Sequence, residues 1–545
     1  NCVTVTVGRS YKQVGKQHYE LSPQVPEEFE RLLRELYNQS SEQSFGIVYL
    51  WGMLASSVNE STRQLHAGHL ASIGVLHLVQ ALATTKQEIS PRLWLITSGV
   101  HAVKEQDRTT GLLQAPLWGL GRVIVYEHQN LHCTLIDIDA TPLEECLDAL
   151  LKEIRSDEEE DEVALRSDRR YVARLAHYAL PDRQTQGEDL FRSDGTYLIT
   201  GGLGGVGLRT AQWMVERGAR HLVLMGRRGV PEVAEAMLQT MCESGANVHV
   251  LQGDVAQEKD VQKALILIRC EMPPLRGVFH AAVVLNDSTL LQLNRERFLS
   301  VMPSKVDGAW NLHCLTLDEP LDYFVLFSSA ASLIGSPGQG NYAAANAFMD
   351  MLAHYRRQQG YPALCINWGR WNEVGQAMKE NRGDRLDARG FTGMKPKKGL
   401  TILEALLCQS PPQVGAMSFN LPKWSQFYPD LTRSSLFTHL VEEPDTKKEN
   451  GTRSYLTSEM LTNLDNVQRH QKLTLYLSDQ IARVLGHASL RLDAHQQLNR
   501  LGIDSLMSVE LKNRIRSDLN VVTPVTTFLQ GITFEQLITQ IMERI

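Results

Sequence analysis

A tyrosine, a serine, a lysine and an asparagine occur in a pattern that could support proton transfer to a carbonyl group. Ser329 ends an apolar run typical of a buried strand, and Tyr342 follows at the start of a helical pattern. Asn346 comes four positions after Tyr342, so both share one helix face. Lys305 lies upstream in a segment whose helix is expected to begin at Pro303. Reduction of a carbonyl needs a hydride donor, groups that polarise the oxygen, and a proton donor.

These side chains could divide that work. Ser329 and Tyr342 would polarise the oxygen, and Tyr342 would donate the proton. The Lys305 ammonium and a nicotinamide would lower the pKa of this phenol, and Asn346 would hold the lysine or a relay water. Taken singly, each residue has a structural explanation, such as a strand cap or a core tyrosine. Their joint occurrence after a cofactor signature favours the catalytic interpretation.

That signature is a glycine-rich run between an apolar segment, 196–200, and a helical pattern, 208–217. It predicts a strand, a tight turn and a helix. Glycines let the backbone approach a pyrophosphate closely, and the N-terminus of the helix stabilises the negative charge. The run consists of Gly201, Gly202, Leu203, Gly204, Gly205, Val206 and Gly207. An isolated run of this kind is as often structural as functional.

Residues that follow the next two predicted strands indicate which dinucleotide is bound. Arg227 and Arg228 follow the second strand, where an NAD-binding protein would place an acidic side chain. An arginine there suits the 2′-phosphate of NADP, so NADPH is the expected cofactor. Asp254 and Val255 follow the third strand and could border the adenine ring. An aspartate at a strand end is also a common helix cap.

Composition excludes several classes of protein. The 545 residues suggest about three or four domains, the hydrophobic content is 43%, and the net charge is −7. Basic residues are dispersed, so we expect no nucleic-acid partner. The sequence has neither an apolar run of about 20 residues nor a signal-peptide pattern, so we expect no association with a membrane. Eight scattered cysteines without a Cys-x-x-Cys pair argue against zinc and disulfides. We therefore expect a cytoplasmic protein without metal.

Strand and helix patterns alternate in two long stretches. They predict an α/β fold of two Rossmann-like, doubly wound parallel-sheet subdomains and a small four-helix domain. The expected parts are a structural subdomain without cofactor at 1–180, a cofactor-binding subdomain at 190–435, a flexible linker at 436–466 and the helical domain at 467–545. Strands of the first subdomain are expected near 3–7, 46–51, 92–97 and 131–138.

Ser505 starts a helical pattern in the last domain. The Asp504–Ser505 step is most simply a helix cap, but the positive end of the helix dipole would also tolerate a phosphodiester at this serine. The other helices of this domain are expected near 471–485, 524–529 and 533–544.

Six motifs between residues 195 and 375 resemble the ketoreductase domain of modular polyketide synthases, a branch of the short-chain dehydrogenase/reductases. They are Gly201–Gly207, Val278–Ala282, Lys305–Trp310, Phe327–Ser329, Gly338–Asn346 and Ile366–Gly369. Ordinary short-chain dehydrogenases carry a lysine four residues after the tyrosine. Here Asn346 has that place and Lys305 comes from another helix, as is usual in the polyketide branch. Residues 1–178 resemble the structural subdomain without its usual first strand and helix, so we expect an excised piece of a longer polypeptide.

Leu501–Met507 resembles the signature of acyl carrier proteins, whose serine takes a 4′-phosphopantetheine arm. The resemblance implies NADPH-dependent reduction of a β-ketoacyl thioester, held on Ser505, to a β-hydroxyacyl thioester for secondary metabolite biosynthesis. The implied partners are the tethered acyl chain, a phosphopantetheinyl transferase, and synthase domains such as ketosynthase, acyltransferase or dehydratase.

Leu285-Asn286-Asp287 resembles the family's Leu-Asp-Asp motif, which accompanies a D-hydroxyl product. Asp287 is kept and no tryptophan lies in 330–341, so a D product is expected. An Asn-Asp pair also favours a turn whatever the substrate. Two alternatives remain open: the equivalent part of an animal-type fatty acid synthase, and a carrier domain joined to an inactive reductase scaffold.

Overall fold

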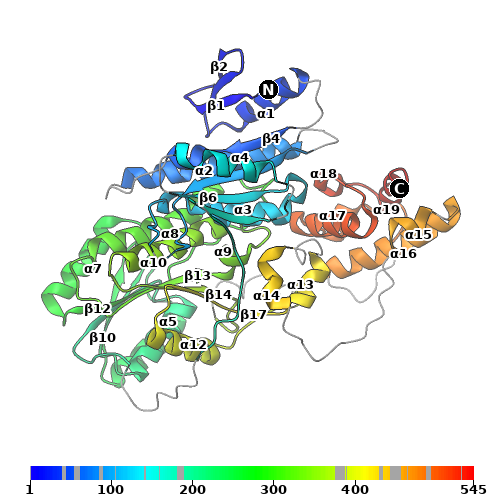
Figure 1. Ribbon diagram of the computed structural model, residues 1–545. Coiled ribbons are helices and arrows are strands. Elements are labelled where there is room, and N and C mark those ends of the chain that lie inside the picture. The colour runs from blue at the N-terminus through cyan, green and yellow to red at the C-terminus, as the bar shows by residue number, and fades with distance from the viewer. Residues whose placement is uncertain are drawn as a thin grey trace. The chain divides into compact units, whose positions relative to one another are not determined.

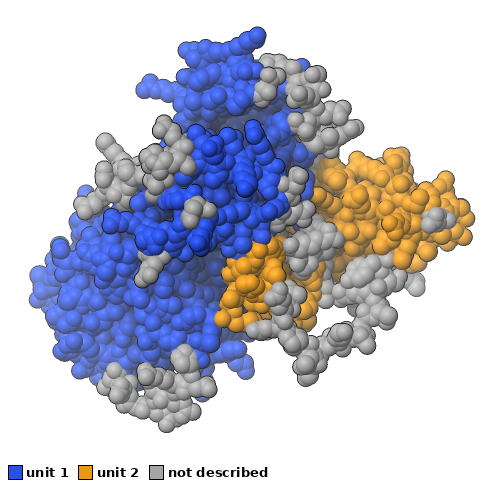
Figure 2. Space-filling model, in the orientation of Figure 1, with its two compact units in different colours: residues 1–173, 178–380, 393–418 blue, residues 174–177, 381–392, 419–545 orange. Residues whose placement is uncertain are grey.

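The computed structural model forms two compact units (Figures 1 and 2). Unit 1 comprises residues 1–173, 178–380 and 393–418, and unit 2 comprises residues 174–177, 381–392 and 419–545. The structure describes residues 2–39, 45–54, 62–84, 90–104, 106–139, 143–156, 158, 160–167, 169–180, 190–374, 387, 389–428, 434–441, 456–462, 464–485, 492–529 and 531–545. The expected linker, 436–466, thus lies partly outside the described residues.

The second α/β part of unit 1, residues 190–374 and 393–418, is built on a parallel sheet in the order β11-β10-β9-β12-β13-β14-β16. Its strands are β9 (Thr196–Thr200), β10 (His221–Gly226), β11 (Asn247–Gln252), β12 (Leu275–His280), β13 (Tyr323–Ser329), β14 (Leu364–Trp368) and β16 (Gln413–Ala416). The strand order reverses between β9 and β12. Such a switch point opens a crevice at the carboxyl ends of the strands, where open sheets bind ligands.

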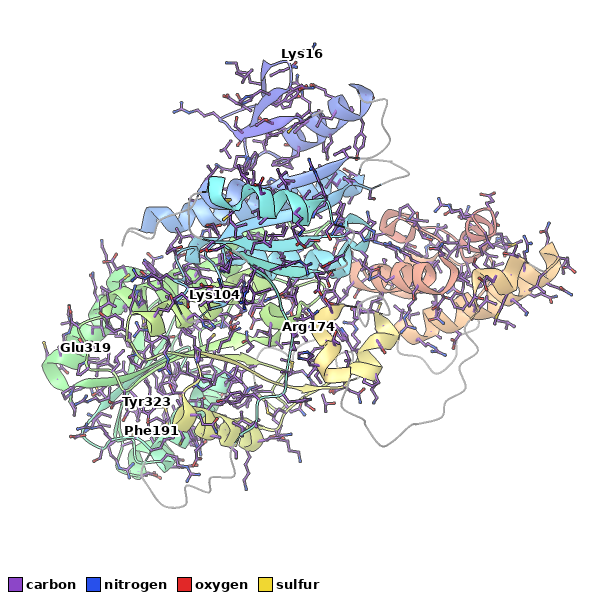
Figure 3. All side chains as sticks on the ribbon, in the orientation of Figure 1. Lys16, Lys104, Arg174, Phe191, Glu319 and Tyr323 are labelled. Carbon is purple, nitrogen blue, oxygen red and sulfur yellow. The ribbon has the colours of Figure 1, made fainter. Side chains whose placement is uncertain are left out.

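Helices connect these strands. They are α5 (Gly205–Glu216), α6 (Glu232–Glu243), α7 (Glu258–Glu271), α8 (Arg295–Leu315), α9 (Ala330–Ile334), α10 (Gly340–Gln358) and α12 (Pro396–Gln409). All five residues of β9 are buried, as expected for a strand covered on both faces. Phe191 and Tyr323, labelled in Figure 3, pack with their ring centroids 5.7 Å apart near one end of the sheet.

The first α/β part, residues 2–173, contains a sheet in the order β4-β5-β6-β7-β8, in which only the β7–β8 pair is antiparallel. Its elements are β4 (Gly46–Tyr49), β5 (Arg92–Ser98), β6 (Thr134–Ile138), β7 (Glu162–Arg166), β8 (Arg169–Val172), α1 (Pro26–Gln39), α2 (Thr62–Thr84), α3 (Pro116–Glu127) and α4 (Leu143–Ile154). The strand expected at 3–7 lies outside this sheet. It is β1 (Thr4–Val7), which pairs with β3 (His18–Leu21) in a separate sheet with β2 (Lys12–Gly15).

Helix α2 is the one helix among the described residues that is long and apolar enough to cross a membrane. Its apolar window, Ala67–Thr84, is 72% buried inside the protein. It packs against α1, α3 and α8, as a core helix does.

Unit 2 contains a helical bundle that includes α15 (Ser458–Thr462), α16 (Asn466–Leu485), α17 (Ser505–Leu519), α18 (Val525–Leu529) and α19 (Phe534–Met542). Its apolar core includes Leu477, Leu511 and Phe534, which are all at most 2% exposed. The same unit holds α13 (Leu421–Phe427) and α14 (Thr438–Val441). The helices expected near 471–485, 524–529 and 533–544 therefore form, and the helical pattern expected from Ser505 is α17.

Candidate active site

The glycine run forms a cradle between β9 and α5. Gly201 has a φ of +69°, and a Cβ on it would lie 2.7 Å from the backbone of Ala281, which follows β12 across the switch point. A Cβ on Gly207 would lie 2.3 Å from the carbonyl oxygen of Gly201. Side chains at these two positions would therefore block the turn. No side chain caps the first turn of α5 at Gly204, so the cradle fits the pyrophosphate of a dinucleotide.

The other predicted cofactor residues follow β10 and β11, the two strands that lie to one side of β9 in the sheet. Arg227 and Arg228 are exposed after β10. Asp254 Oδ1 accepts a hydrogen bond from the backbone N–H of Ala256 at 3.0 Å, so this side chain makes a local turn, as its capping interpretation predicts. Val255 is 5% exposed and belongs to the apolar core. Of the four, the two arginines are the ones whose side chains reach solvent freely.

Tyr342, Ser329 and Asn346 converge at the carboxyl end of the sheet. Ser329 ends β13, and its Oγ accepts a hydrogen bond from Ala331 N at 3.2 Å as the cap of α9. The Ser329 and Asn346 side chains are both hydrogen-bonding neighbours of the Tyr342 phenol. Asn346 donates from Nδ2 to the Tyr342 carbonyl oxygen at 2.8 Å, while its buried Oδ1 has no hydrogen-bond partner among the described residues. This oxygen is therefore available to a water or an ammonium.

The pKa of Tyr342 is raised to about 12, because burial outweighs the opposing hydrogen bonds from Ser329 and Asn346, and Asp287 raises it further. The protein groups around Tyr342 do not lower its pKa as predicted, and Lys305 is not among the groups that shift it. Lys305 Nζ instead donates a hydrogen bond to the Phe327 carbonyl oxygen at 2.6 Å. Burial lowers the pKa of Lys305 to about 8.

The helix that carries Lys305 also begins earlier than expected. Pro303 lies inside α8, which starts at Arg295 after the cap Asn294. The Asn294 side chain accepts a hydrogen bond from the Arg297 N–H at 2.8 Å. A proline is disfavoured inside a helix because it lacks the N–H donor, so the sequence pattern favoured a start at Pro303. Tertiary packing of α8 against α10 overrides this local preference.

A buried carboxylate fixes helix α10, which carries Tyr342, to the sheet. Asp350 accepts hydrogen bonds from Ser328 Oγ at 2.6 Å and from Ser332 Oγ at 2.7 Å. Asn367 Nδ2 on β14 donates to the same carboxylate at 2.9 Å. Burial raises the pKa of Asp350, although these hydrogen bonds oppose the rise. The cluster joins α10, α9, β13 and β14 at one point.

The sequence interpretation missed a second carboxylate, which comes from the first α/β part. Glu127 ends α3 and is 1% exposed. Its Oε1 accepts a hydrogen bond from Gly338 N at 2.7 Å, in the loop before Tyr342, and its Oε2 accepts one from Leu290 N at 2.6 Å. One side chain of the first part therefore holds two loops beside the candidate site. The only sequence signal was an acidic residue at the end of an apolar helix, where the helix dipole disfavours it.

Asp287 lies on one of these two loops. Its Oδ2 accepts a hydrogen bond from Gln339 Nε2 at 2.9 Å, which links it to the loop that leads into α10. Arg297 holds the backbone of the same turn by donating to the Asp287 carbonyl oxygen at 2.7 Å. The predicted stereocontrol residue thus faces the segment that carries Tyr342, and Gln339 and Arg297 were not predicted.

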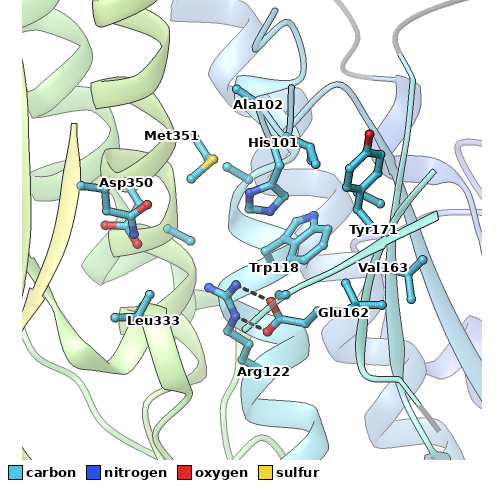
Figure 4. A pocket seen from close by; sticks show the side chains of 17 residues that line it. His101, Ala102, Trp118, Arg122, Glu162, Val163, Tyr171, Leu333, Asp350 and Met351 are labelled. Atoms are coloured by element: carbon cyan, nitrogen blue, oxygen red, sulfur yellow. Dashed lines mark hydrogen bonds and ion pairs between the residues drawn. The ribbon is translucent and has the colours of Figure 1, made fainter. Parts of the chain in front are cut away.

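A pocket of about 320 Å³ lies between the two α/β parts (Figure 4). Trp118 and Arg122 of α3 form one side of it, and Asp350 and Met351 of α10 form the other. Arg122 makes an ion pair with Glu162 at 2.6 Å within its wall. Lys305, Ser329, Tyr342 and Asn346 do not line this pocket, so it is separate from the candidate site.

Ser505 is partly exposed at the start of α17. Asp504 caps this helix, and its Oδ1 accepts a hydrogen bond from Met507 N at 2.8 Å. The cap occupies the aspartate and leaves the serine hydroxyl at the positive end of the helix dipole. This geometry satisfies both the capping interpretation and the attachment interpretation.

Comparison with known families agrees with this arrangement. Residues 195–373 match the KR domain, residues 17–175 match the Rossmann fold domain of the polyketide synthase extender module SpnB, and residues 476–541 match the phosphopantetheine attachment site. The first two matches cover the two α/β parts, and the third covers α17 with Ser505.

Individual relatives are polyketide synthases and their ketoreductases. The chain is 34% identical over 511 residues to a phenolphthiocerol/phthiocerol polyketide synthase of Mycobacterium tuberculosis, with 92% of this chain and 27% of that protein covered. It is 31% identical to a 6-methylsalicylic acid synthase of Arthrobotrys oligospora, with 94% and 29% covered. The chain therefore spans between a quarter and a third of the length of these two relatives.

Solved structures extend the similarity to the fold. An A1-type ketoreductase is 32% identical with a TM-score of 0.69, and the match covers 78% of this chain and 89% of that chain. The first ketoreductase of the tylosin synthase is 28% identical with a TM-score of 0.67, with 81% and 94% covered. The chain belongs to the ketoreductases of polyketide synthases and carries a phosphopantetheine attachment domain.

Proposed function

We propose that this chain reduces a β-ketoacyl thioester to a β-hydroxyacyl thioester while the acyl group is tethered to Ser505. One observation carries the proposal. The phenol of Tyr342, with Ser329 and Asn346 beside it, lies at the same end of the sheet as the glycine cradle that follows β9. The proposed proton donor and the proposed dinucleotide site therefore lie at the same end of the sheet.

Tyr342 supplies the proton to the ketone oxygen. Its pKa of about 12 keeps the phenol protonated at neutral pH, and Ser329 offers a second donor to the same oxygen. Asn346 Oδ1 is free to hold the Lys305 ammonium or a relay water that returns a proton to the phenolate. A bound nicotinamide would supply the hydride.

The proton-donor role is tested by Tyr342→Phe. General acid catalysis is worth about 100- to 10,000-fold, so oxidation of NADPH with a β-ketoacyl thioester should fall by at least about 100-fold. Reduction at the wild-type rate would show that Tyr342 is not the donor. Absence of any reduction in the wild-type chain would favour the alternative of a carrier joined to an inactive scaffold.

NADPH is the proposed donor because Arg227 and Arg228 stand exposed after β10, in a segment, 226–231, that has no acidic residue. Arginine pairs well with phosphate, so kcat/KM should be larger with NADPH than with NADH. Equal values for the two would remove this assignment. We propose that Gly201 to Gly207 hold the pyrophosphate and that Asp254 and Val255 border the adenine.

Ser505 is the proposed attachment point of 4′-phosphopantetheine. Treatment with a phosphopantetheinyl transferase should add the mass of one arm to the wild-type chain and none to Ser505→Ala. A mass gain in the variant would refute the assignment. The expected partners are this transferase and the ketosynthase, acyltransferase or dehydratase of the same synthase.

For stereochemistry we propose a D-hydroxyl product, on the basis of Asp287 and its hydrogen bond to Gln339. Chiral chromatography of the released hydroxy acid tests this, and an L product would contradict it.

A polyketide intermediate is favoured over one from an animal-type fatty acid synthase, because the relatives are polyketide synthases. No disulfide joins any of the eight cysteines, which all lie among the described residues; this supports the proposed cytoplasmic location, because disulfides are rare in reducing compartments.

A further inference from the structure

Helix α17 buries charged side chains that lie outside the bundle's apolar core. Glu510 is fully buried and Arg514 is 4% exposed. The core side of the helix is formed by apolar residues such as Leu511 and Ile515. Charged side chains are almost never buried unless they are paired. A second partner in unit 2 must therefore cover the charged side of α17.

That partner is α13 together with Arg389. Arg389, which is 8% exposed, forms an ion pair with Glu510, and the Tyr428 hydroxyl donates a hydrogen bond to Glu510 Oε1 at 3.0 Å. The guanidinium of Arg514 lies over the ring of Phe427, 4.5 Å from its centroid. Glu510 and Arg514 thus both meet groups of complementary chemistry, and Arg514 also donates a hydrogen bond to Gln480 Oε1 of α16 at 2.7 Å.

The pKa of Arg389 reflects attraction between this arginine and acidic groups of α17. Burial acts to lower the pKa of Arg389, but attraction to Glu510 outweighs it and raises the pKa above its ordinary value. Tyr428 and Asp504 act in the same sense. Arg389 therefore interacts electrostatically both with Glu510 and with Asp504, the residue that precedes Ser505.

The attachment serine remains accessible in this arrangement. Ser505 and Glu510 are five positions apart, which corresponds to about 140° around an α-helix. Consistent with this, Ser505 is partly exposed while Glu510 is buried. A carrier held through Glu510 can therefore present its arm from a different side of α17.

We propose that Arg389 and α13 form a docking site for α17 of this chain's own carrier domain, with Glu510 as the charge that the site recognises. This proposal rests on the proposed function, since it concerns delivery of the tethered substrate. The site lies beyond the residues that match the KR domain, 195–373, so it belongs to the connection between reductase and carrier. It would favour carriers with an acidic residue at this position and disfavour carriers with a basic one.

Hydrogen–deuterium exchange on the full chain tests the contact without relying on the reaction. Arg389→Glu and Glu510→Arg should each speed exchange in α13 and α17 by about 10- to 100-fold, the range expected when a charged hydrogen-bonding partner is lost. The double variant should restore slow exchange in both helices. Lys472→Glu makes the same charge change as Arg389→Glu at an exposed position on α16 and should leave both helices unchanged.

Reduction assays separate this proposal from the function itself. Arg389→Glu should reduce a free β-ketoacyl thioester at the wild-type rate but reduce the Ser505-tethered substrate more slowly. If Arg389→Glu exposes the whole carrier, Tyr428→Phe decides, because it removes one hydrogen bond and should speed exchange only in α13 and α17. Unchanged exchange in α13 in these variants, or a double variant no slower than the single ones, would overturn the docking site.

Discussion

Replacing Glu127 with glutamine would test whether the first α/β part controls chemistry in the second. Glu127 holds the backbone N–H groups of Gly338 and Leu290 with its two carboxylate oxygens. Glutamine has nearly the same shape but only one acceptor oxygen, and its NH₂ group would face one of the two N–H donors. The variant therefore removes one anchor and leaves a buried donor unpaired.

The cost follows from these contacts. A hydrogen bond to a charged group contributes about 1.5–3 kcal/mol, and a buried unpaired donor costs about 1–3 kcal/mol. Both contacts hold loops beside the site. If losing one contact raises the activation free energy by about 1.4–2.8 kcal/mol, because the loops are less well positioned, kcat falls about 10- to 100-fold. The KM for NADPH should stay close to the wild-type value, since the backbone groups that Glu127 holds, at Leu290 and Gly338, do not belong to the glycine run 201–207.

The assay should follow kcat with a free β-ketoacyl thioester, the KM for NADPH, the ratio of product enantiomers, and the free energy of unfolding in urea. The ratio is informative because Asp287 lies on one held loop and Gln339 on the other. A positioning defect should lower kcat and shift this ratio. A purely structural defect should lower only the unfolding free energy.

Asp137→Asn is the matched control. Asp137 is also fully buried in the first α/β part, where it accepts hydrogen bonds from the backbone N–H groups of Val100 at 3.0 Å and His101 at 3.1 Å and forms an ion pair with Arg166 at 2.6 Å. These contacts stay within the first part, so this variant should lose stability and keep its kcat. The reasoning fails if Glu127→Gln loses as much stability as the control while its kcat stays within about twofold of wild type, a factor too small for a lost hydrogen bond.

Two further predictions concern a buried charge and a close backbone contact. Burial lowers the pKa of Lys305 from 10.5 in the unfolded chain to about 8 in the folded protein. Between these two pH values the unfolded chain binds one more proton than the folded protein, so the stability of the wild-type protein should rise as the pH increases from about 8 to 10.5. The gain, up to about 3 kcal/mol, should be absent from Lys305→Met in urea unfolding, and an equal gain in both proteins would contradict the buried charge. Gly207→Ala should weaken NADPH binding by at least about fivefold, because overpacking of this kind costs about 1–3 kcal/mol. Gly229→Ala, whose Cβ would meet nothing within 4 Å, should bind NADPH normally, and calorimetry that finds no difference between the two variants would exclude the tight cradle.

Local patterns predicted most of the elements and much of the candidate site. β9 spans 196–200 as expected, and α17 begins at Ser505. Tyr342 and Asn346 share a face of α10 because helical spacing alone places them there. Such features depend on neighbours within one or two turns of the chain, which the sequence shows directly.

Contacts between distant segments could not be predicted in this way. Glu127 lies 163 positions from Leu290 and 211 positions from Gly338, and no periodicity connects residues so far apart. The raised pKa of Tyr342 depends on burial, which is a property of the folded protein. The small sheet of β1 also escaped prediction, because an apolar strand pattern does not show which sheet the strand joins.

The cluster around Asp350 has a consequence for how substrate range could change in this family. Hydrogen bonds from two serines and an asparagine hold α10 against two strands, so sliding or rotating that helix would leave a buried carboxylate without partners. Evolution and protein engineering therefore have little freedom to relocate the phenol. For the proposed acyl substrates, changes in the segments 281–294 and 335–339, which contain Asp287 and Gln339, should be better tolerated, and random libraries confined to those segments should yield more active variants than libraries in the helix.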